Sequence, residues 1–374
     1  MQFIDLRAQF ERIEEDVLKR VESVLRSQKF ILGPEVFELE EKLAEFVGVK
    51  HALSCSSGTD ALVIPLMAYD LCADDAIFVP SLTFFASAES ITLAGGTPVF
   101  IDSDPISFNI CPNCLQAAIE RTLNEGKLSP RGIMAVDLFG CPADYNSLEK
   151  TAEQYDLFLI EDAAQGLGGN YKGQSAGSFG NVAATSFFPA KPLGCYGDGG
   201  AIFTDDDDLA QIIASIRVHG QGKDKYDNVR IGLNGRLDTI QAAVLLSKLS
   251  IFEEEIYNRN KISATYSERL SDILTIPTIP EGSHSAWAQY TVTIEDEQKR
   301  TQIIEALKKQ GVPTAIYYPV PIHLSTAYKS LGYKEGDLPI SEDLSKRVLS
   351  LPMHSYLTES DIDAITTTIR ECYE

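Results

Sequence analysis

Six short runs of apolar residues alternate with longer amphipathic stretches in the first part of the chain. They are AIFVPS at 76–81, TPVFID at 97–102, GIMAVDLFG at 132–140, YDLFLIED at 155–162, VAATSFF at 182–188 and AIFT at 201–204. Their hydrophobicity is continuous, which indicates strands covered on both faces by the intervening helices. The pattern predicts an α/β fold with a mostly parallel sheet. Ligands bind beyond the carboxyl ends of strands in such sheets, so the residues after each run are candidates for function.

The pattern changes after Arg236. A long helical stretch covers 237–274, a strand-like run QYTVTI follows at 289–294, and helices are expected near EQKRTQIIEALKKQG, SEDLSKRVLS and TESDIDAITTTIREC. A chain of 374 residues suits two domains. We expect a large α/β domain at 1–254 and a smaller α+β domain at 255–374, with the N-terminal segment packing on the smaller one. Because no Pro/Gly/Ser-rich linker separates them, the two domains are expected to pack together.

The composition excludes several classes of partner. Acidic residues number 54 against 32 basic ones, a net charge of -22, which repels nucleic acid and anionic lipid. The N-terminus lacks the apolar stretch of a signal peptide and no segment reaches membrane-span length, so we expect a cytoplasmic protein without a membrane partner. The seven cysteines are scattered, and the CxxC of Cys111 and Cys114 has no second pair, so neither disulfides nor a metal site are expected.

Two polar residues follow predicted strands in positions that favour chemistry. Lys191 enters a Gly-rich loop after VAATSFF. Burial there would favour the neutral amine that forms a Schiff base with an aldehyde, although a loop lysine can also extend to solvent. Asp162 ends YDLFLIED. It either caps a following helix or keeps a proton on a pyridine nitrogen, and Gln165 could bond the phenolic oxygen of such a ring.

A phosphate site and an aromatic surface complete this set. The stretch SCSSGTDAL, beginning at Ser54, runs from a Ser/Gly/Thr turn into an apolar helix, which suits a phosphate cradle or a plain N-cap. Ser186 adds a second hydroxyl. Phe84 and Phe85 follow a strand and either belong to the core or stack on a planar ring. An amine, an acid, an aromatic ring and a phosphate cradle are together the requirements of pyridoxal 5'-phosphate.

The order and spacing of these motifs resemble the DegT/DnrJ/EryC1/StrS family of sugar aminotransferases. The resemblance implies pyridoxal-phosphate fold type I, with a large domain around a seven-stranded sheet and a smaller C-terminal domain. The motifs that carry it are FILGPEV at 30–36, SSGTDAL at 56–62, PSLTFF at 80–85, EDAAQ at 161–165, SFFPAK at 186–191, GDGG at 197–200 and GLNGRLDTIQAA at 232–243.

The resemblance assigns roles on the ring side of the cofactor. It implies that Lys191 is the Schiff-base lysine, which also carries the proton between cofactor and substrate carbon. Asp162 would be the partner of the pyridinium nitrogen and Gln165 the contact of the phenolic oxygen. The implied reaction passes an amino group from L-glutamate, which leaves as 2-oxoglutarate, to a nucleotide-linked keto-sugar. The product would be an amino sugar for a surface polysaccharide or other glycan.

The resemblance also assigns the phosphate contacts. Gly58, Thr59 and Ser186 would form the phosphate cradle, and Phe84 would stack on the ring. Asn234 would be a phosphate ligand from the neighbouring subunit, which implies a homodimer with shared active sites.

The substrate side leaves alternatives open. The loop SFFPAKPLGCYGDGG resembles members that aminate carbon 3, including those acting on UDP-linked 2-acetamido-3-keto-glucuronate. Those members tend to carry His before Tyr-Pro, where this chain has Tyr317 in AIYYPVPIH. A 4-keto-6-deoxy sugar is therefore the rival substrate. Arg236 would approach the sugar nucleotide, and Tyr318 and His323 would line the sugar pocket, although an isolated buried His often has only a structural role.

Two other activities conflict with the residues present. Relatives that dehydrate sugars at carbon 3 carry His in place of the Schiff-base lysine, and Lys191 argues against that chemistry. A regulator that binds cofactor without turnover would be expected to have lost a catalytic element, and each expected element is present.

Overall fold

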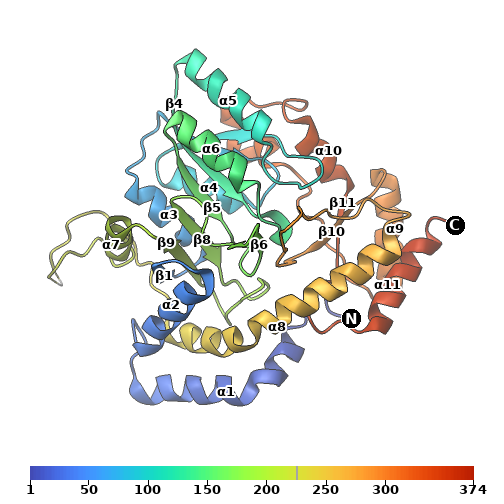
Figure 1. Ribbon diagram of the computed structural model, residues 1–374, viewed down its shortest axis with the longest axis horizontal. Coiled ribbons are helices and arrows are strands. Elements are labelled where there is room, and N and C mark those ends of the chain that lie inside the picture. Colours follow the sequence, from blue (N-terminus) through green and yellow to red (C-terminus); the bar gives the residue numbers. More distant parts are fainter. Residues whose placement is uncertain (225) are drawn as a thin grey trace.

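The computed structural model describes residues 1–224 and 226–374 and is built around a seven-stranded sheet (Figure 1). The strand order is β1-β9-β8-β5-β4-β2-β3. These strands are β1 (His51–Cys55), β2 (Asp75–Pro80), β3 (Thr97–Ile101), β4 (Ser129–Val136), β5 (Phe158–Asp162), β8 (Val182–Ser186) and β9 (Gly200–Thr204). Strand β9 is antiparallel to β1 and β8, whereas the other neighbouring pairs are parallel. The expected mostly parallel α/β sheet is confirmed.

Both faces of the sheet are covered by helices. In β2, Ile77 and Val79 pack in one hydrophobic core with α3, α4 and α7, while Ala76 and Phe78 pack in another with α5 and α6. A third core joins β1, β8 and β9 to α2 and the first half of α8. This two-sided cover explains the continuous hydrophobicity of the strands. The helices are α2 (Pro34–Val47), α3 (Gly58–Ala68), α4 (Phe85–Leu93), α5 (Pro112–Glu125), α6 (Tyr145–Tyr155), α7 (Asp207–Ile216) and α8 (Thr239–Leu270).

Each of the six predicted runs contains a strand, but two details differ from the prediction. The run at 132–140 ends as a strand at Val136, and Leu138–Gly140 forms the 3-10 turn η1, in which Phe139 has a φ of 61°. The sheet also contains β1, which was not predicted. Its five residues, HALSC, begin with His and end with Ser and Cys, so the apolar signal is weak.

The C-terminal part forms a second, smaller body. Its core contains Tyr266 of α8, Tyr290 and Leu349. The expected helix over SEDLSKRVLS is wrong at its end, because the apolar residues from Val348 onward pair with β10. Its elements are β10 (Tyr290–Thr293), α9 (Glu297–Lys309), α10 (Pro339–Arg347), β11 (Val348–Leu351) and α11 (Glu359–Glu371). The remaining short elements are β6 (Asn170–Tyr171), β7 (Gln174–Ser175), η2 (Ile322–Leu324) and η3 (Thr326–Leu331).

The expected boundary between residues 254 and 255 falls inside α8, which continues without a break. Phe252 belongs to the core of the large sheet, whereas Ile262 belongs to the core of the smaller body. Residues after the boundary also return to the large sheet, since Ile322 and Tyr328 pack in the core that holds α3 and α4. The domain boundary stays a prediction, with α8 shared by both cores.

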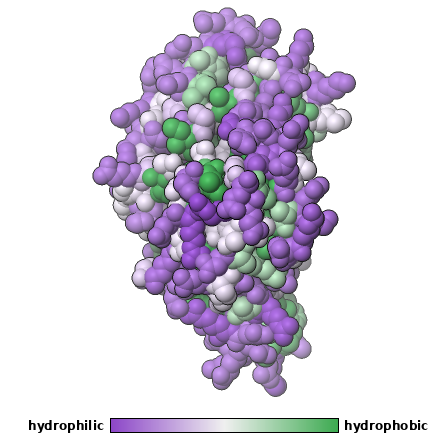
Figure 2. Space-filling view, turned by 90° about the vertical axis from the view of Figure 1, so that its right-hand side faces the viewer, coloured by the Kyte–Doolittle hydropathy of each residue, from purple (hydrophilic) through white to green (hydrophobic). Residues whose placement is uncertain are grey.

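The N-terminal helix α1 (Leu6–Ser27) packs along α8, where Ile13 and Val17 contact Val244. Just before it, the carbonyl of Phe3 accepts a hydrogen bond of 3.3 Å from the N–H of Met353 in the smaller body. Within the described part of the chain, every helix is too short or too polar to cross a membrane. The face in Figure 2 is largely hydrophilic with apolar patches between, in keeping with the acidic composition.

Candidate active site

Four of the predicted site residues, Asp162, Gln165, Ser186 and Lys191, lie at or just after the carboxyl ends of β5 and β8. Asp162 is the last residue of β5 and is paired in register with Ala184. Ser186 therefore lies two residues further along the neighbouring parallel strand, where β8 ends. Lys191 lies in the loop that follows. This is the edge at which α/β sheets bind ligands.

Asp162 is buried and held by two hydrogen bonds. Ser87 Oγ donates to its Oδ2 over 2.7 Å, and the N–H of Ala164 donates to its Oδ1 over 3.2 Å. A turn follows Asp162 rather than an α-helix, so the helix-cap alternative does not describe this residue. The pKa of Asp162 is raised because the carboxyl group is buried, and the nearby amine of Lys191 offsets part of this shift. A cationic ring nitrogen beside this carboxylate would stabilise its charged form and so offset the cost of burying that charge.

Lys191 is half-buried in the loop that follows β8. Burial lowers the pKa of Lys191, and the charge of Asp162 opposes this shift. The loop is fixed by a hydrogen bond of 2.8 Å from the N–H of Lys191 to the carbonyl of Phe188. Because the lowered pKa favours the neutral amine, Lys191 Nζ is suited to attack an aldehyde and to take up a proton.

Gln165 links the end of β5 to two other segments. Its Oε1 accepts a hydrogen bond of 2.8 Å from the N–H of Phe139, and its Nε2 donates to the hydroxyl of Tyr318 over 3.2 Å. The ring of Phe84 lies 6.1 Å from that of Tyr318. Phe84 is 55% exposed, whereas Phe85 packs against the core, so Phe84 is the member of the pair available to a planar ligand.

The N-terminus of α3 forms a close cradle with Ser186. Ser57 caps the helix by accepting a hydrogen bond of 3.0 Å from the N–H of Asp60. A Cβ on Gly58 would lie 2.5 Å from Cβ of Ser186, so only glycine fits there. Gly58 and Thr59 begin the helix, where N–H groups lack partners within the helix and attract phosphate.

Together, these groups fit pyridoxal phosphate. The cradle at Gly58 suits the phosphate, the exposed face of Phe84 suits the ring, the carboxylate of Asp162 suits a ring cation, and the desolvated amine of Lys191 suits an aldehyde. When bound, this cofactor supplies the aldehyde and an electron-withdrawing ring. The protein would supply the charge partner through Asp162, the orientation through Phe84 and the cradle, and an amine able to move a proton through Lys191.

Two predicted residues lie on a separate segment beside the cradle. The carbonyl of Gly235 accepts a hydrogen bond of 3.1 Å from the N–H of Ser56, which places this segment next to the start of α3. Asn234 is exposed. The Nε of Arg236 is buried and has no hydrogen-bond partner among the described residues. An unpaired guanidinium nitrogen beside a phosphate cradle suits an anionic ligand.

The residues predicted for the sugar side have different partners in the structure. Tyr318 reaches Gln165, and the ring of Tyr317 lies 6.3 Å from that of Phe3. His323 is buried, with Nδ1 2.7 Å from Ser81 Oγ and Nε2 3.2 Å from Glu342 Oε1. Both of its ring nitrogens are therefore occupied, and this geometry supports a structural role rather than the expected contact with substrate.

Sequence reasoning missed Ser87, which donates to Asp162 from the first turn of α4. Its position three residues after Phe84, at the start of a helix that follows a strand, was the available signal. Nothing local indicated its partner, because Asp162 is 75 residues away in sequence.

The model of the DegT/DnrJ/EryC1/StrS aminotransferase family matches residues 11–370. UDP-2-acetamido-2-deoxy-3-oxo-D-glucuronate aminotransferase of Pseudomonas aeruginosa is 44% identical over 372 residues, 99% of each chain. A crystal structure of a DegT DnrJ EryC1 StrS aminotransferase from Brucella abortus has a TM-score of 0.96 and 51% identity over 99% of each chain. The structure of NtdA from Bacillus subtilis with bound cofactor PMP has a TM-score of 0.88 and 26% identity, covering 99% of this chain and 83% of that one. The chain belongs to the DegT/DnrJ/EryC1/StrS family and is a pyridoxal-phosphate-dependent sugar aminotransferase.

Proposed function

We propose that this enzyme transfers the amino group of L-glutamate to the carbon-3 ketone of a UDP-linked 2-acetamido-3-keto-uronate. The observation that carries this proposal is the 44% identity, over 99% of each chain, to the aminotransferase that acts on UDP-2-acetamido-2-deoxy-3-oxo-D-glucuronate. The rival is a 4-keto-6-deoxy sugar, because Tyr317 stands where carbon-3 enzymes of the family tend to carry His.

Such a substrate carries a diphosphate and a carboxylate, while the protein has a net charge of -22. Binding must therefore rely on placed cations rather than on the overall field. Arg236 is suited to this task, because its buried Nε lacks a partner among the described residues and its segment adjoins the cradle. A guanidinium group binds planar carboxylates and phosphates through paired N–H groups.

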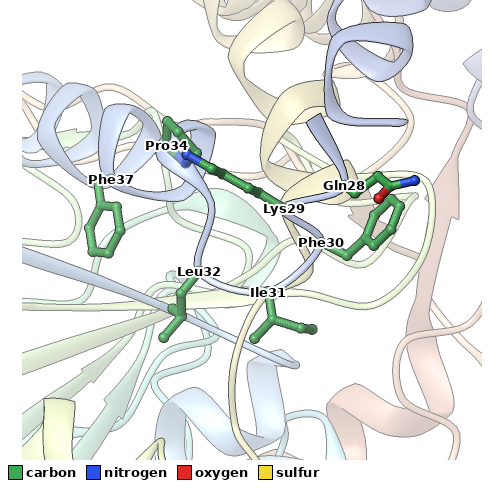
Figure 3. A pocket seen from close by; sticks show the side chains of 7 residues that line it. All are labelled: Gln28, Lys29, Phe30, Ile31, Leu32, Pro34 and Phe37. Carbon is green, nitrogen blue, oxygen red and sulfur yellow. The ribbon is translucent and has the colours of Figure 1, made fainter. Parts of the chain in front are cut away.

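We also propose that the working unit is a homodimer, with Asn234 reaching the site of the partner subunit. Large apolar side chains are exposed on the loop between α1 and α2 and at the start of α2: Phe30 and Ile31 of the loop are 42% and 50% exposed, and Phe37 of α2 is 55% exposed. Figure 3 shows these side chains with Leu32 around a shallow pocket. Apolar residues gathered in this way are typical of a protein interface.

This apolar loop is joined to the segment that carries Asn234. The carbonyl of Phe30 accepts a hydrogen bond of 3.0 Å from the N–H of Thr239, and the N–H of Gly33 donates to Thr239 Oγ1 over 3.0 Å. Ile231, on the other side of Asn234, is 84% exposed. A second copy of the chain that covers the apolar loop would therefore also meet the segment around Asn234.

The test of the substrate is direct amination. Purified enzyme is incubated with L-glutamate and a panel of UDP- and dTDP-linked 3-keto and 4-keto sugars, and product mass and the position of the new amine are read by mass spectrometry and NMR. We expect the 3-keto-uronate to give a 3-amino product with the largest kcat/KM. A 4-amino product formed in preference from a 4-keto-6-deoxy sugar would overturn the proposal.

A further inference from the structure

Lys248 places an amine in the interior of the molecule. This residue lies in the first half of α8 and is only 1% exposed. Its Nζ has no hydrogen-bond partner among the described residues. A buried ammonium group is costly unless another charge or an aromatic face compensates for the water that it loses. An apolar side chain would fill the same space without this cost, so the amine requires an explanation of its own.

The ring of Tyr196 faces this amine. Lys248 Nζ lies 4.3 Å from the centroid of the Tyr196 ring, which is within the range of a cation–π contact. Burial lowers the pKa of Lys248 to about 8, and the carboxylate of Glu255, two turns further along α8, opposes this shift. The charged form of the amine therefore still predominates at neutral pH. Lys248 is a cation held against an aromatic ring.

A second residue of α8 holds the backbone at Tyr196. The N–H of Tyr196 donates to Gln241 Oε1 over 2.9 Å, and Gln241 Nε2 donates to the carbonyl of Tyr196 over 3.3 Å. Phe10 of α1, the helix that runs along α8 in Figure 1, meets the Tyr196 ring edge-on with centroids 6.1 Å apart. Tyr196 is thus fixed to α8 through both its backbone and its ring.

Tyr196 belongs to the loop that carries Lys191. This loop covers residues 187–199 and connects β8 to β9. The carbonyl of Phe187 accepts a hydrogen bond of 2.8 Å from the N–H of Cys195, which closes the part of the loop that contains Lys191. A loop closed in this way moves as a unit. The contacts of Tyr196, the residue next to the closing hydrogen bond, therefore decide how the loop is oriented.

We propose that Lys248 is a positioning residue for transamination. Its ammonium group holds the ring of Tyr196 against α8, and together with Gln241 this contact fixes the direction in which the loop presents Lys191 to the cofactor. Lys248 acts through Tyr196 and is not itself a catalytic residue. The proposal rests on the assignment of Lys191 as the residue that bonds the aldehyde, and it is independent of which keto-sugar is the substrate.

Lys248→Met separates the charge from the space that the side chain fills. Methionine keeps an unbranched apolar stem but cannot make the cation–π contact. We expect kcat to fall by about tenfold or more, because small displacements of a reacting group have large effects on rate. Absorbance should show full occupancy by the cofactor, and Tm should stay at or above that of wild type, because a buried charge is removed. A residue with only a structural role would lose Tm and kcat together.

Two variants of Tyr196 provide the matched comparison. Tyr196→Phe keeps the aromatic face and should keep kcat within about threefold of wild type, whereas Tyr196→Leu should lower it as Lys248→Met does. The double variant Lys248→Met/Tyr196→Leu should be no worse than either single variant, because both changes remove the same contact. Additive losses in the double variant would contradict the proposal.

Hydrogen exchange of the purified protein gives a readout that needs neither substrate nor turnover. Peptides from residues 187–199, followed by mass spectrometry, should exchange at least about threefold faster in Lys248→Met and Tyr196→Leu than in wild type and Tyr196→Phe. An error in the proposed keto-sugar would leave this result unchanged. Wild-type exchange in Lys248→Met, wild-type kcat despite faster exchange, or a loss of Tm in parallel with kcat would overturn the proposal.

Discussion

Asp162 and Asn234 both belong to the candidate site, but their surroundings differ. Asp162 is buried and accepts hydrogen bonds from Ser87 and Ala164, so the ring side is organised within one chain. Asn234 is exposed, and neighbouring Arg236 keeps a buried Nε without a partner among the described residues. The contrast agrees with the proposal that one chain holds the groups expected to act on the ring, whereas the expected phosphate and substrate side would be completed by ligands and by a second chain.

The largest effect is expected at the amine on the ring side. Lys191→Ala removes the group that bonds the aldehyde and moves the proton, so transamination should fall by many orders of magnitude. The fold should persist, because the residue lies in a loop outside the main cores. Absorbance spectra would show that the cofactor is no longer linked to the protein, and thermal unfolding would show a Tm close to wild type. A variant that still turns over would refute the assignment of Lys191.

Asp162→Asn is expected to have the next largest effect. The amide keeps the shape but cannot stabilise a cationic ring nitrogen, so kcat should fall by about 10²-fold or more while cofactor remains bound. Ser87→Ala is the matched control, because it removes only the hydrogen bond of 2.7 Å to Asp162 Oδ2 and should cost about tenfold or less. Equal losses in the two variants, measured as kcat at saturating substrate, would argue against a distinct role for the carboxylate charge.

A mixed dimer tests whether the phosphate side is shared. Asn234→Asp would place a carboxylate against the cofactor phosphate and should inactivate the enzyme, as Lys191→Ala does. If Asn234 acts across the interface, a dimer with one defect per chain has one site with both defects and one wild-type site. Its activity should therefore recover to about half that of wild type, since one of the two sites is intact.

The measurement uses differently tagged chains that are co-expressed, purified as the mixed dimer and assayed with glutamate and keto-sugar. Homodimers of each variant, purified in parallel, are the controls. Continued inactivity of a folded mixed dimer would mean that Asn234 serves its own chain.

The smallest effect on catalysis is expected for His323→Gln. Because both ring nitrogens of His323 are engaged by Ser81 and Glu342 inside the protein, the change should lower stability by about 1–3 kcal/mol and leave kcat per folded site near wild type. Urea unfolding followed beside the amination assay separates the two quantities. A large change in KM for the keto-sugar with unchanged stability would restore His323 to the sugar pocket.

The sequence predicted the parts of the molecule that depend on local pattern. Continuous apolar runs predicted strands such as β2 and β8. Asp162 and Lys191 could be singled out because Asp162 ends such a run and Lys191 follows one. The strand β1 was missed because its five residues are partly polar. Contacts between distant segments, such as Ser87 with Asp162 and His323 with Ser81, depend on tertiary packing. The hydrophobic periodicity of the sequence does not reveal them.

The unbroken course of α8 has a consequence for how the molecule loses its structure. At 1.5 Å per residue, its 32 residues span about 48 Å, and they contribute side chains first to the core of the large sheet and then to that of the smaller body. Melting one half of the helix would expose apolar surface in one body and would remove the continuous element that connects it to the other body. We therefore expect the two bodies to unfold in one cooperative transition, with the amide hydrogens in the middle of α8 among the slowest to exchange.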